Sequence, residues 1–418
     1  MKILLATYWA IPHVGGVWNY MEQHKRKLES LGHEVDILGY NEDNTAVTLL
    51  NKGEQLEKEK LLPLLEAKLN EELYPAIHAN PLVKYTEFQR YIFELAAAYF
   101  GLDQYDVIHT QDVIATASIK RVLPENTALV STLHGSVAHE IRNQLVTIHK
   151  SPNSYMARAY FDDLEHIGAT SADHTIVANE WLKNILLGEF NVPIDQLKVL
   201  HYGFDTEDFL KKMKEKTTSL KLPTNKKVIL YTGRLIELKG VHHLVNALGK
   251  LKEIRDDWVC WIAGEGDKQE ELEARAKELG LEYDIFFFGN REDVPYLVSV
   301  CDIYVFPSLL ENQPLSVVEA QIAGKPIIVS DAGGLPEMVE HGKTGIISPA
   351  GDEIALCDNM NVLLSNDLYR KKLGSNAKKW GMTYWSMSKG VKNIVDVYKE
   401  AISKKRKENT DVSLETEN

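Results

Sequence analysis

The sequence contains few of the residues that stabilise secreted or membrane proteins. Its 418 residues include three cysteines, Cys260, Cys301 and Cys357, and this odd number without metal-ligand or redox spacing argues against a disulfide framework. No apolar stretch approaches the roughly 18 residues that a membrane span needs. The apolar run after Met1 is too short for a signal peptide and reads as a first strand. These absences predict buried thiols in a cytoplasmic protein without a transmembrane segment.

An excess of positive charge is also absent. The formal net charge is −13, and residues 1–205 hold 17 Lys and Arg against 27 Asp and Glu. An acidic first half is a poor platform for nucleic acid or anionic lipid, because both attract basic surfaces. We therefore expect no nucleic-acid partner. Peripheral membrane contact stays open, since a local basic patch can lie within an acidic total.

The dinucleotide-binding fingerprint Gly-x-Gly-x-x-Gly is missing after the first strand, which disfavours a Rossmann oxidoreductase. A Gly15-Gly16 pair stands there instead, preceded by Pro12 and His13. Two glycines at a helix N-terminus allow a phosphate or a sugar to pass close to the backbone. The same pair could also form only a tight turn.

Apolar runs alternate with helical periodicity along the chain, as in α/β proteins. Such runs read as buried parallel strands, and two consecutive series predict two Rossmann-like, doubly wound domains that face each other across a cleft. The first series comprises Ile3–Thr7, Val35–Leu38, Val107–His109, Leu129–Leu133 and Thr175–Val177, and the second comprises Val228–Thr232, Val259–Ala263, Ile285–Gly289, Ile303–Pro307, Ile327–Ser330 and Ile346–Ser348.

The break between the two series predicts the domain boundaries. We expect an N-terminal acceptor domain over 1–205, with a long helical insertion at about 51–99, and a C-terminal donor domain over 206–380. The insertion could shape an acceptor site or form a solvated helical pair. A helix over 381–403 is expected to cross back to the first domain. The polar and charged residues 404–418 predict a disordered tail.

The segment from Ser308 to Pro326 places Glu311 just before a helix and Glu319 two turns inside it. Pro314 suits the first turn, where its missing N–H costs nothing, and Asn312 or Gln313 could cap the helix. Free backbone N–H groups at such a start bind anions. A diphosphate at the helix start, with Glu319 on paired sugar hydroxyls and Glu311 beyond the phosphates, fits a nucleotide sugar. Two solvated glutamates on an amphipathic helix are the alternative.

A second phosphate-binding element follows the strand Val228–Thr232. Gly233 lets the backbone approach a ligand closely, Arg234 offers a fork of donors to a diphosphate, and Lys239 adds a compact charge. The element opens a helix at the carboxyl edge of the expected sheet, where α/β proteins bind ligands. Either cation alone could be an ordinary surface residue.

These motifs together resemble the retaining GT-B glycosyltransferases of family 4, also described as glycosyl transferases group 1. The segment from Glu311 to Glu319 matches their Glu-x7-Glu signature and the following Ala-x-x-x-Gly-x-Pro, although Asn312-Gln313-Pro314-Leu315 departs from the commonest form. The second element matches their Gly-Arg-x-x-x-x-Lys-Gly. His134, in Thr132-Leu-His134-Gly135, matches their Thr-x-His-Gly. The resemblance spans nearly the whole chain and is least close over 51–99.

The resemblance implies the site residues. In such enzymes the histidine contacts the transferred sugar, and the Arg and Lys grip the leaving nucleotide diphosphate. It implies His134, Arg234, Lys239 and Glu311 as catalytic residues. The donor-binding residues implied are Gly15, Gly16, Gly233, Arg234, Lys239, Gly264, Asn290, Glu311, Asn312, Gln313, Pro314, Leu315, Ser316 and Glu319. His109 also matches a strand end of the family, and structural packing is an equal alternative.

The predicted activity is therefore a retaining, metal-independent hexosyl transfer from a UDP- or GDP-sugar. No Asp-x-Asp metal motif is evident, and we expect no cofactor besides the donor as co-substrate. Because no nucleophilic carboxylate can be nominated in the first domain, same-face attack is favoured. The acceptor could be a saccharide, a lipid-linked molecule or a small molecule. The alternatives are a nucleotide-sugar epimerase or sugar phosphorylase of the same fold, or a non-catalytic nucleotide-sugar-binding module.

Overall fold

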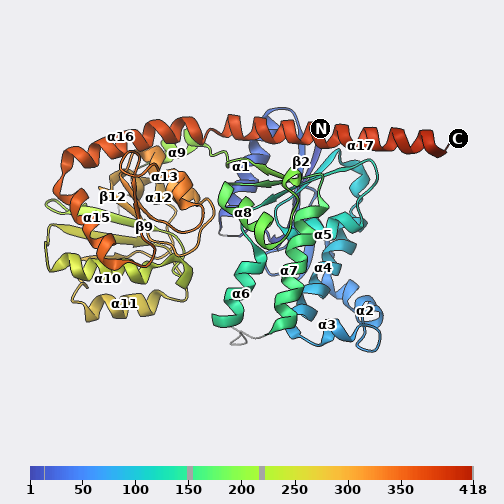
Figure 1. Ribbon diagram of the computed structural model, residues 1–418, viewed down its shortest axis with the longest axis horizontal. Helices are drawn as coiled ribbons and strands as arrows, with labels where there is room; N and C mark the ends of the chain where they lie inside the picture. The colour runs from blue at the N-terminus through green and yellow to red at the C-terminus, as the bar shows by residue number, and fades with distance from the viewer. Residues whose placement is uncertain (14, 148–153, 216–221, 417–418) are drawn as a thin grey trace. The chain divides into compact units, whose positions relative to one another are not determined.

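The computed structural model of the chain describes residues 1–13, 15–147, 154–215 and 222–416. It forms two compact units (Figure 1): unit 1 comprises residues 1–202 together with the chain after Met387, and unit 2 comprises Gly203–Met387. Residues 216–221 of the polar stretch after the predicted boundary, and residues 417 and 418 of the predicted tail, lie outside the described residues.

Unit 1 is built on an eight-stranded sheet with the order β4-β3-β2-β1-β5-β6-β7-β8. Strands β2 to β4 pair antiparallel, and all other neighbouring strands pair parallel. Strand order reverses between β1 and β5, and in parallel sheets ligands bind beyond the carboxyl ends of the strands at such a point. The strands are β1 Lys2–Ala10, β2 Glu34–Tyr40, β3 Ala46–Leu49, β4 Glu54–Glu57, β5 Val107–Thr110, β6 Ala128–Leu133, β7 His174–Val177 and β8 Leu197–Val199.

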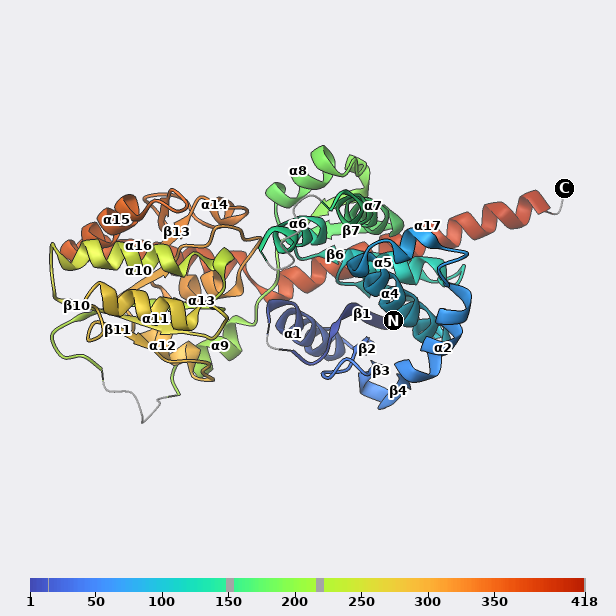
Figure 2. The same ribbon diagram turned by 90° about the horizontal axis from the view of Figure 1, so that it is seen from below.

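The helices of unit 1 bury the apolar strands. Helices α4, α5 and α7 pack against one another (Figure 2), and their apolar side chains share a core with β1, β2, β5 and β6. The α-helices are α1 Gly16–Ser30, α2 Lys58–Lys68, α3 Pro75–His78, α4 Pro81–Tyr99, α5 Val113–Arg121, α6 Val137–Thr147, α7 Tyr155–Ser171 and α8 Glu180–Glu189, and the 3-10 turns are Leu50–Lys52, Leu102–Gln104 and Ile194–Gln196.

The segment 51–99 differs from the expected long helical insertion. It begins with a 3-10 turn and with β4, which pairs with β3 to extend the sheet by an antiparallel hairpin, and only then continues as α2, α3 and α4. Strands β3, β4 and β8, of four, four and three residues, were not predicted. Strand β4 reads Glu-Gln-Leu-Glu, without the apolar run of a buried strand.

Unit 2 contains a six-stranded, fully parallel sheet with the order β11-β10-β9-β12-β13-β14. Taken in chain order, this is the Rossmann arrangement 3-2-1-4-5-6, with its reversal between β9 and β12. All six expected strands are present. They are β9 Lys227–Thr232, β10 Trp258–Ala263, β11 Ile285–Phe287, β12 Ile303–Phe306, β13 Ile327–Ser330 and β14 Ile346–Ser348.

Helices cover both faces of the unit 2 sheet (Figure 1). Helix α10 packs with α11 and α15, whereas α13 packs with α9, α12 and α16. The core includes the buried and unpaired thiols Cys260, Cys301 and Cys357, as predicted. The helices are α9 Thr206–Lys212, α10 Val241–Lys252, α11 Gln269–Glu278, α12 Val294–Val300, α13 Leu315–Ala323, α14 Leu335–Met338, α15 Glu353–Ser365 and α16 Asp367–Tyr384, with a 3-10 turn at Glu237–Lys239.

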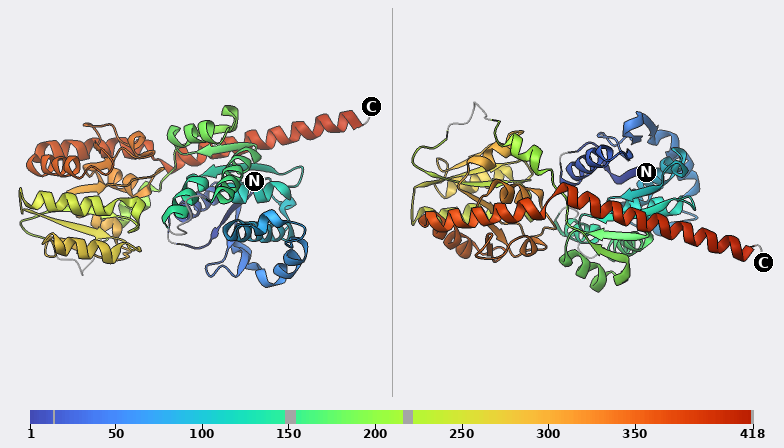
Figure 3. Two further views of the ribbon diagram at one scale, coloured as in Figure 1. Left: turned by 60° about the horizontal axis from the view of Figure 1, so that its bottom comes forward. Right: turned by 90° about the horizontal axis from the view of Figure 1, so that it is seen from above.

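The C-terminal segment is one long helix, α17 (Met387–Thr416), separated from α16 by Trp385 and Ser386. From Ser388 onward this helix belongs to unit 1 (Figure 3). Its Val391 and Ile394 are buried, and its Tyr398 hydroxyl lies 2.6 Å from Nδ1 of His109. The helix continues where composition predicted a disordered tail. Lys, Arg and Glu, which are frequent there, lose little side-chain freedom in a helix.

Candidate active site

In unit 2, the loops after β9 and β10 meet through glycine backbones. Gly264 has a φ of +142°, and a Cβ there would lie 1.9 Å from the carbonyl oxygen of Gly233. The Gly233 N–H donates to Ala263 O at 3.0 Å, and the Leu235 N–H donates to Glu265 O at 2.8 Å. The predicted glycines therefore bring two strand ends into backbone contact next to the reversal of strand order.

The two predicted cations of unit 2 have different surroundings. Lys239 ends the 3-10 turn Glu237–Lys239, and its ammonium pairs with Oε1 of Glu311 while lying 5.7 Å from the centroid of the Phe306 ring. Both side chains of this pair are largely buried. Arg234 is exposed, and within the described ranges its guanidinium has no hydrogen-bond or ionic partner. One cation is thus held by a carboxylate, and the other is available to a ligand.

The loop that carries Glu311 is fixed by its backbone. The Leu309 N–H donates to Leu238 O at 2.8 Å, and the Gly334 N–H donates to Glu311 O at 2.9 Å. Gly333 adopts a φ of +61°, and a Cβ there would lie 1.9 Å from the same Glu311 oxygen. The glycine turn after β13 therefore positions the Glu311 loop.

Helix α13 starts one residue later than expected. Its N-cap is Pro314, with no side-chain cap hydrogen bond, so the prediction that Asn312 or Gln313 caps the helix is wrong. Both of those side chains are buried beside it. The backbone N–H groups of Leu315 and Ser316 have no acceptor among the residues that the structure describes. An uncapped helix start with open N–H groups favours an anion.

Glu319 lies inside α13 and is half-buried. Burial raises the pKa of its carboxyl to about 7, and the charge of Lys212 opposes this shift. In the described part of the chain it has no hydrogen-bond partner. Near it, Ser316 bonds to the Tyr304 hydroxyl, which lies 2.8 Å from Oγ1 of Thr232 at the end of β9. An unsatisfied, desolvated carboxyl suits an incoming pair of hydroxyl groups.

The loops after β10 and β11 form the outer side of this region. Gly264 and Gly289 form an antiparallel bridge, and the Asn290 N–H donates to Oε1 of Glu265 at 3.1 Å. The Arg291 guanidinium lies 5.3 Å from the centroid of the Phe288 ring. The structure thus brings Gly233, Gly264 and Asn290 to adjoining loops. The role of Asn290 in donor binding stays a prediction.

In unit 1, Gly15 and Gly16 begin α1. Gly15 is its N-cap and offers no side-chain cap, and His13 donates from Nδ1 to Ala10 O at 2.7 Å beside it. A Cβ on Gly15 would lie 2.9 Å from the His13 ring. A larger residue at Gly15 would therefore crowd His13. With glycine there, no side chain covers the backbone at the start of α1.

His134 follows β6 and lies half-buried, with both ring nitrogens engaged. Nδ1 lies 2.6 Å from the Tyr202 hydroxyl, and Nε2 lies 3.0 Å from Oε1 of Gln111. Burial lowers the pKa of His134 to about 3, and the nearby His24 lowers it further. A neutral imidazole is a hydrogen-bonding group and a poor proton acceptor, so this arrangement fits ligand contact better than general base catalysis.

His109, the second histidine at a strand end, is fully buried. Its Nδ1 contacts Tyr398 of α17, and its Nε2 lies 2.7 Å from Oγ1 of Thr132. These partners support the structural alternative. Sequence reasoning missed Gln111 and Tyr202; the position of Gln111 directly after the strand Val107–Thr110 was the available signal.

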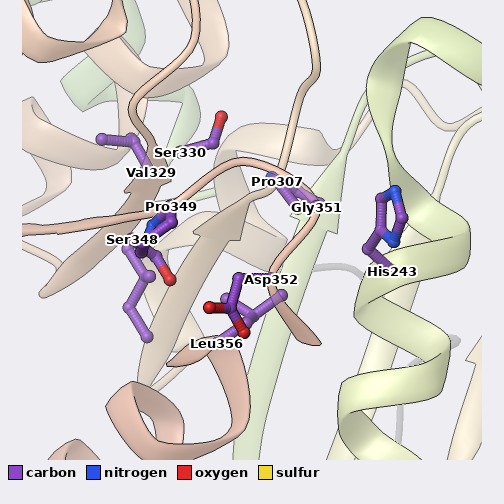
Figure 4. Close-up of a pocket in the computed structure, with 10 residues that line it drawn as sticks. His243, Pro307, Val329, Ser330, Ser348, Pro349, Gly351, Asp352 and Leu356 are labelled. Atoms are coloured by element: carbon purple, nitrogen blue, oxygen red, sulfur yellow. The ribbon is translucent and has the colours of Figure 1, made fainter. Parts of the chain in front are cut away.

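A pocket in unit 2 lies apart from the predicted site residues (Figure 4). It is formed at the ends of β13 and β14 and by α10 and α15, and its empty space of about 250 Å³ includes open solvent. Its lining is His243, Pro307, Ile328, Val329, Ser330, Ser348, Pro349, Gly351, Asp352 and Leu356. The Ser330 hydroxyl bonds to Ser308 O, which links the pocket to the Glu311 loop.

Two kinds of feature are absent from the described residues. None of the helices there is both long and apolar enough to span a membrane. No group of three or more His, Cys, Asp or Glu side chains in the same ranges is arranged to hold a metal ion.

Comparison with known proteins assigns the chain. The family described as Glycosyltransferase Family 4 matches residues 14–208, and the family described as Glycosyl transferases group 1 matches residues 212–380. The chain is a family 4 glycosyltransferase. The first matched segment ends, and the second begins, close to the division between units 1 and 2. The two Rossmann-like sheets are those of the GT-B fold.

Individual relatives match the transferase over nearly its full length. An uncharacterized glycosyltransferase of Methanocaldococcus jannaschii, MJ1607, is 27% identical over 96% of this chain and 99% of its own. A D-inositol 3-phosphate glycosyltransferase of Corynebacterium aurimucosum is 26% identical, over 93% and 92%. The crystal structure of Anabaena Alr3699/HepE with UDP and glucose has a TM-score of 0.68 at 19% identity, covering 96% of the transferase and all of that chain.

Proposed function

We propose that the transferase moves a hexosyl group from a nucleoside diphosphate sugar to an acceptor hydroxyl, with retention of the anomeric configuration and without a metal ion. The observation that carries the proposal is the joint placement of Lys239, Glu311 and the open start of α13 where strand order reverses in unit 2. A cation, a carboxylate and free N–H groups there match a diphosphate joined to a sugar.

The leaving group sets the chemical demand on this site. When the bond between the sugar and the diphosphate breaks, negative charge grows on the diphosphate oxygen. Arg234, Lys239 and the N–H groups of Leu315 and Ser316 would stabilise that charge, as preorganised donors do. Glu319 would hold the ribose hydroxyls, and Glu311 the sugar hydroxyls. The acceptor would attack from the face that the leaving group vacates, which retains the configuration.

The donor base is proposed to be uracil or guanine. A structure of similar fold was determined with UDP and glucose, which supports a UDP-sugar, although likeness at 19% identity establishes only the fold. The relatives include a transferase named for inositol 3-phosphate, a small anionic acceptor. The acidic first half of this chain argues against relying on a general basic surface for such an acceptor.

A panel of UDP-, GDP- and ADP-sugars tests the donor. A ligand that binds only the folded protein raises its melting temperature, so one base should stabilise the transferase more than the others. The stabilising donor is then incubated with candidate acceptors and with chelator, and the anomeric configuration of the product is read by NMR. An inverted product, or a rate that collapses in chelator and returns with magnesium, would contradict the mechanism. Donor conversion without an acceptor would favour an epimerase.

A further inference from the structure

The hydrogen bonds around His134 determine which of its ring nitrogens carries the proton. The side-chain nitrogen of Gln111 donates to the carbonyl oxygen of His109 at 3.1 Å. A carbonyl oxygen only accepts, so the Gln111 amide is oriented with its own oxygen towards His134. That oxygen also only accepts, and it lies 3.0 Å from Nε2. Nε2 therefore carries the hydrogen.

The second nitrogen follows from the first. In a neutral imidazole with Nε2 protonated, Nδ1 is an acceptor. The Tyr202 hydroxyl, 2.6 Å away, then donates to it. The imidazole is bonded from two directions and is further held by Tyr20, whose ring centroid lies 4.9 Å from that of His134 and 4.9 Å from that of Tyr202.

The groups facing His134 also favour a neutral ring. His24 and His109 are buried histidines whose pKa values are lowered by burial, and burial raises the pKa of the Tyr20 phenol. A proton on both nitrogens would require the Tyr202 hydroxyl to turn its hydrogen away and accept from Nδ1.

We propose that Gln111 and Tyr202 are positioning residues, which hold His134 as the neutral tautomer with its hydrogen on Nε2. His134 then stays uncharged and its ring is held in a fixed orientation, with the Nε2–H directed at Gln111. The inference rests on the proposed function, in which His134 contacts the donor sugar. Tyr202 is also the last residue of unit 1 before the chain enters unit 2, so the ring of His134 is bonded directly to the connection between the two units.

The tautomer can be measured without any substrate. In full-length protein labelled with ¹³C and ¹⁵N histidine, the His134 signal is assigned as the one that disappears in His134→Gln. We expect a protonated Nε2 and an unprotonated Nδ1, with no titration from about pH 5.5 to 8.5. A proton on Nδ1, or a titration near the ordinary histidine pKa, would overturn the inference.

The role in transfer is tested by removing one hydroxyl. Tyr202→Phe keeps the ring and loses only the donor to Nδ1. We expect kcat to fall about tenfold and the donor KM to stay within about twofold, because one oriented hydrogen bond is lost in the reacting complex. Tyr105→Phe is the matched control, since it also removes a buried unit 1 hydroxyl, which bonds to Asp36 at 2.7 Å. It should leave kcat and the His134 spectrum unchanged.

A second variant changes the charge of the other partner. Gln111→Glu places a carboxylate at Nε2, which stabilises the imidazolium, so the His134 pKa should rise and a new acid limb should appear in the pH profile of kcat.

The outcomes separate the inference from the proposed function. If Tyr202→Phe has the same kcat as Tyr105→Phe while the wild-type protein transfers sugar, the positioning inference is wrong and the proposed function stands. If no donor is turned over at all, the proposed function fails, and the NMR tautomer alone decides the inference.

Discussion

Unit 2 and unit 1 present different chemistry at the carboxyl ends of their central strands. In unit 2, Arg234, Lys239, Glu311 and Glu319 follow β9 and β12, and all four are ionisable. In unit 1, the groups after β5 and β6 are Gln111 and His134, which are neutral. The difference indicates a division of labour. Under the proposed function, unit 2 would compensate the charge of the diphosphate, whereas unit 1 would orient groups through neutral hydrogen bonds.

The largest expected effect comes from removing a cation of unit 2. Arg234→Ala and Lys239→Ala should each lower kcat/KM by about 10²-fold or more, about 3 kcal/mol, because each loses a preorganised donor to the leaving group. Arg275→Ala is the control, since Arg275 is an exposed cation of the same unit that pairs with Glu278. Steady-state kinetics measure kcat/KM for the three variants. An equal loss of kcat/KM in all three would show that Arg234 and Lys239 have no special role.

Glu319 tests whether unit 2 also holds the nucleoside. Glu319→Ala should weaken binding of the free nucleoside diphosphate about tenfold to a hundredfold, the scale of charge-assisted hydrogen bonds of about 1.5–3 kcal/mol. Calorimetry with the folded variant measures this affinity. An unchanged affinity would return Glu319 to the role of an ordinary helix residue.

Glu311 should behave differently from Glu319 although both lie in one segment. Glu311→Gln keeps the size of the side chain and removes the charge-assisted acceptor for sugar hydroxyls, so transfer should fall about tenfold. The affinity for the nucleoside diphosphate without sugar should change by less than about twofold, because Lys239 is retained. If the bare nucleotide loses as much affinity as the complete donor, Glu311 does not contact the sugar.

The pH dependence of nucleotide binding sharpens the comparison between the units. Burial raises the pKa of Glu319 to about 7, so the ionised acceptor forms as pH rises through neutrality. Nucleotide affinity should therefore increase between about pH 6 and 8, by up to about tenfold if only the carboxylate binds. Glu319→Gln should lack this component, while the ionisation of the diphosphate affects both proteins equally. The neutral His134 of unit 1 should contribute nothing over this range.

The smallest effect concerns stability. Glu165 in α7 accepts from the Ala138 N–H at 2.9 Å, and burial raises the pKa of its carboxyl from 4.5 to about 8. Between these values the folded state binds a proton that the unfolded state does not, so the free energy of unfolding falls as pH rises. Glu165→Gln should flatten this fall, with a melting temperature a few degrees above wild type at about pH 8.5. The exposed Glu34→Gln should follow wild type.

The residues that form the unit 2 site could be predicted because they lie in short segments of continuous sequence. Gly233 to Lys239 and Glu311 to Glu319 each follow a strand, and all six strands of that unit are apolar runs. Strands β3 and β4 could not be predicted in this way, since they stand at the sheet edge and pair antiparallel. The contacts of His134 also escaped prediction, because Gln111 and Tyr202 lie 23 and 68 residues away in the chain.

The helix α13 illustrates a further limit. Its end at Gly324, in a left-handed conformation with a φ of +75°, follows from the local sequence, because glycine adopts that conformation without strain. Its start does not, because Pro314 rather than a polar side chain occupies the N-cap. Whether Asn312 and Gln313 point to the helix or into the surrounding loops depends on packing with residues distant in sequence, and both are buried.

The return of α17 to unit 1 has a consequence for biosynthesis. His109 bonds to Tyr398, 289 residues later in the chain, and unit 2 is encoded entirely between them. At roughly 5–20 residues per second, about 15–60 s separate the translation of the two partners. Unit 2 can thus complete its fold on the ribosome while unit 1, although translated first, still lacks its last helix. Pulse proteolysis of stalled nascent chains should find unit 2 protected before the first 202 residues reach full resistance.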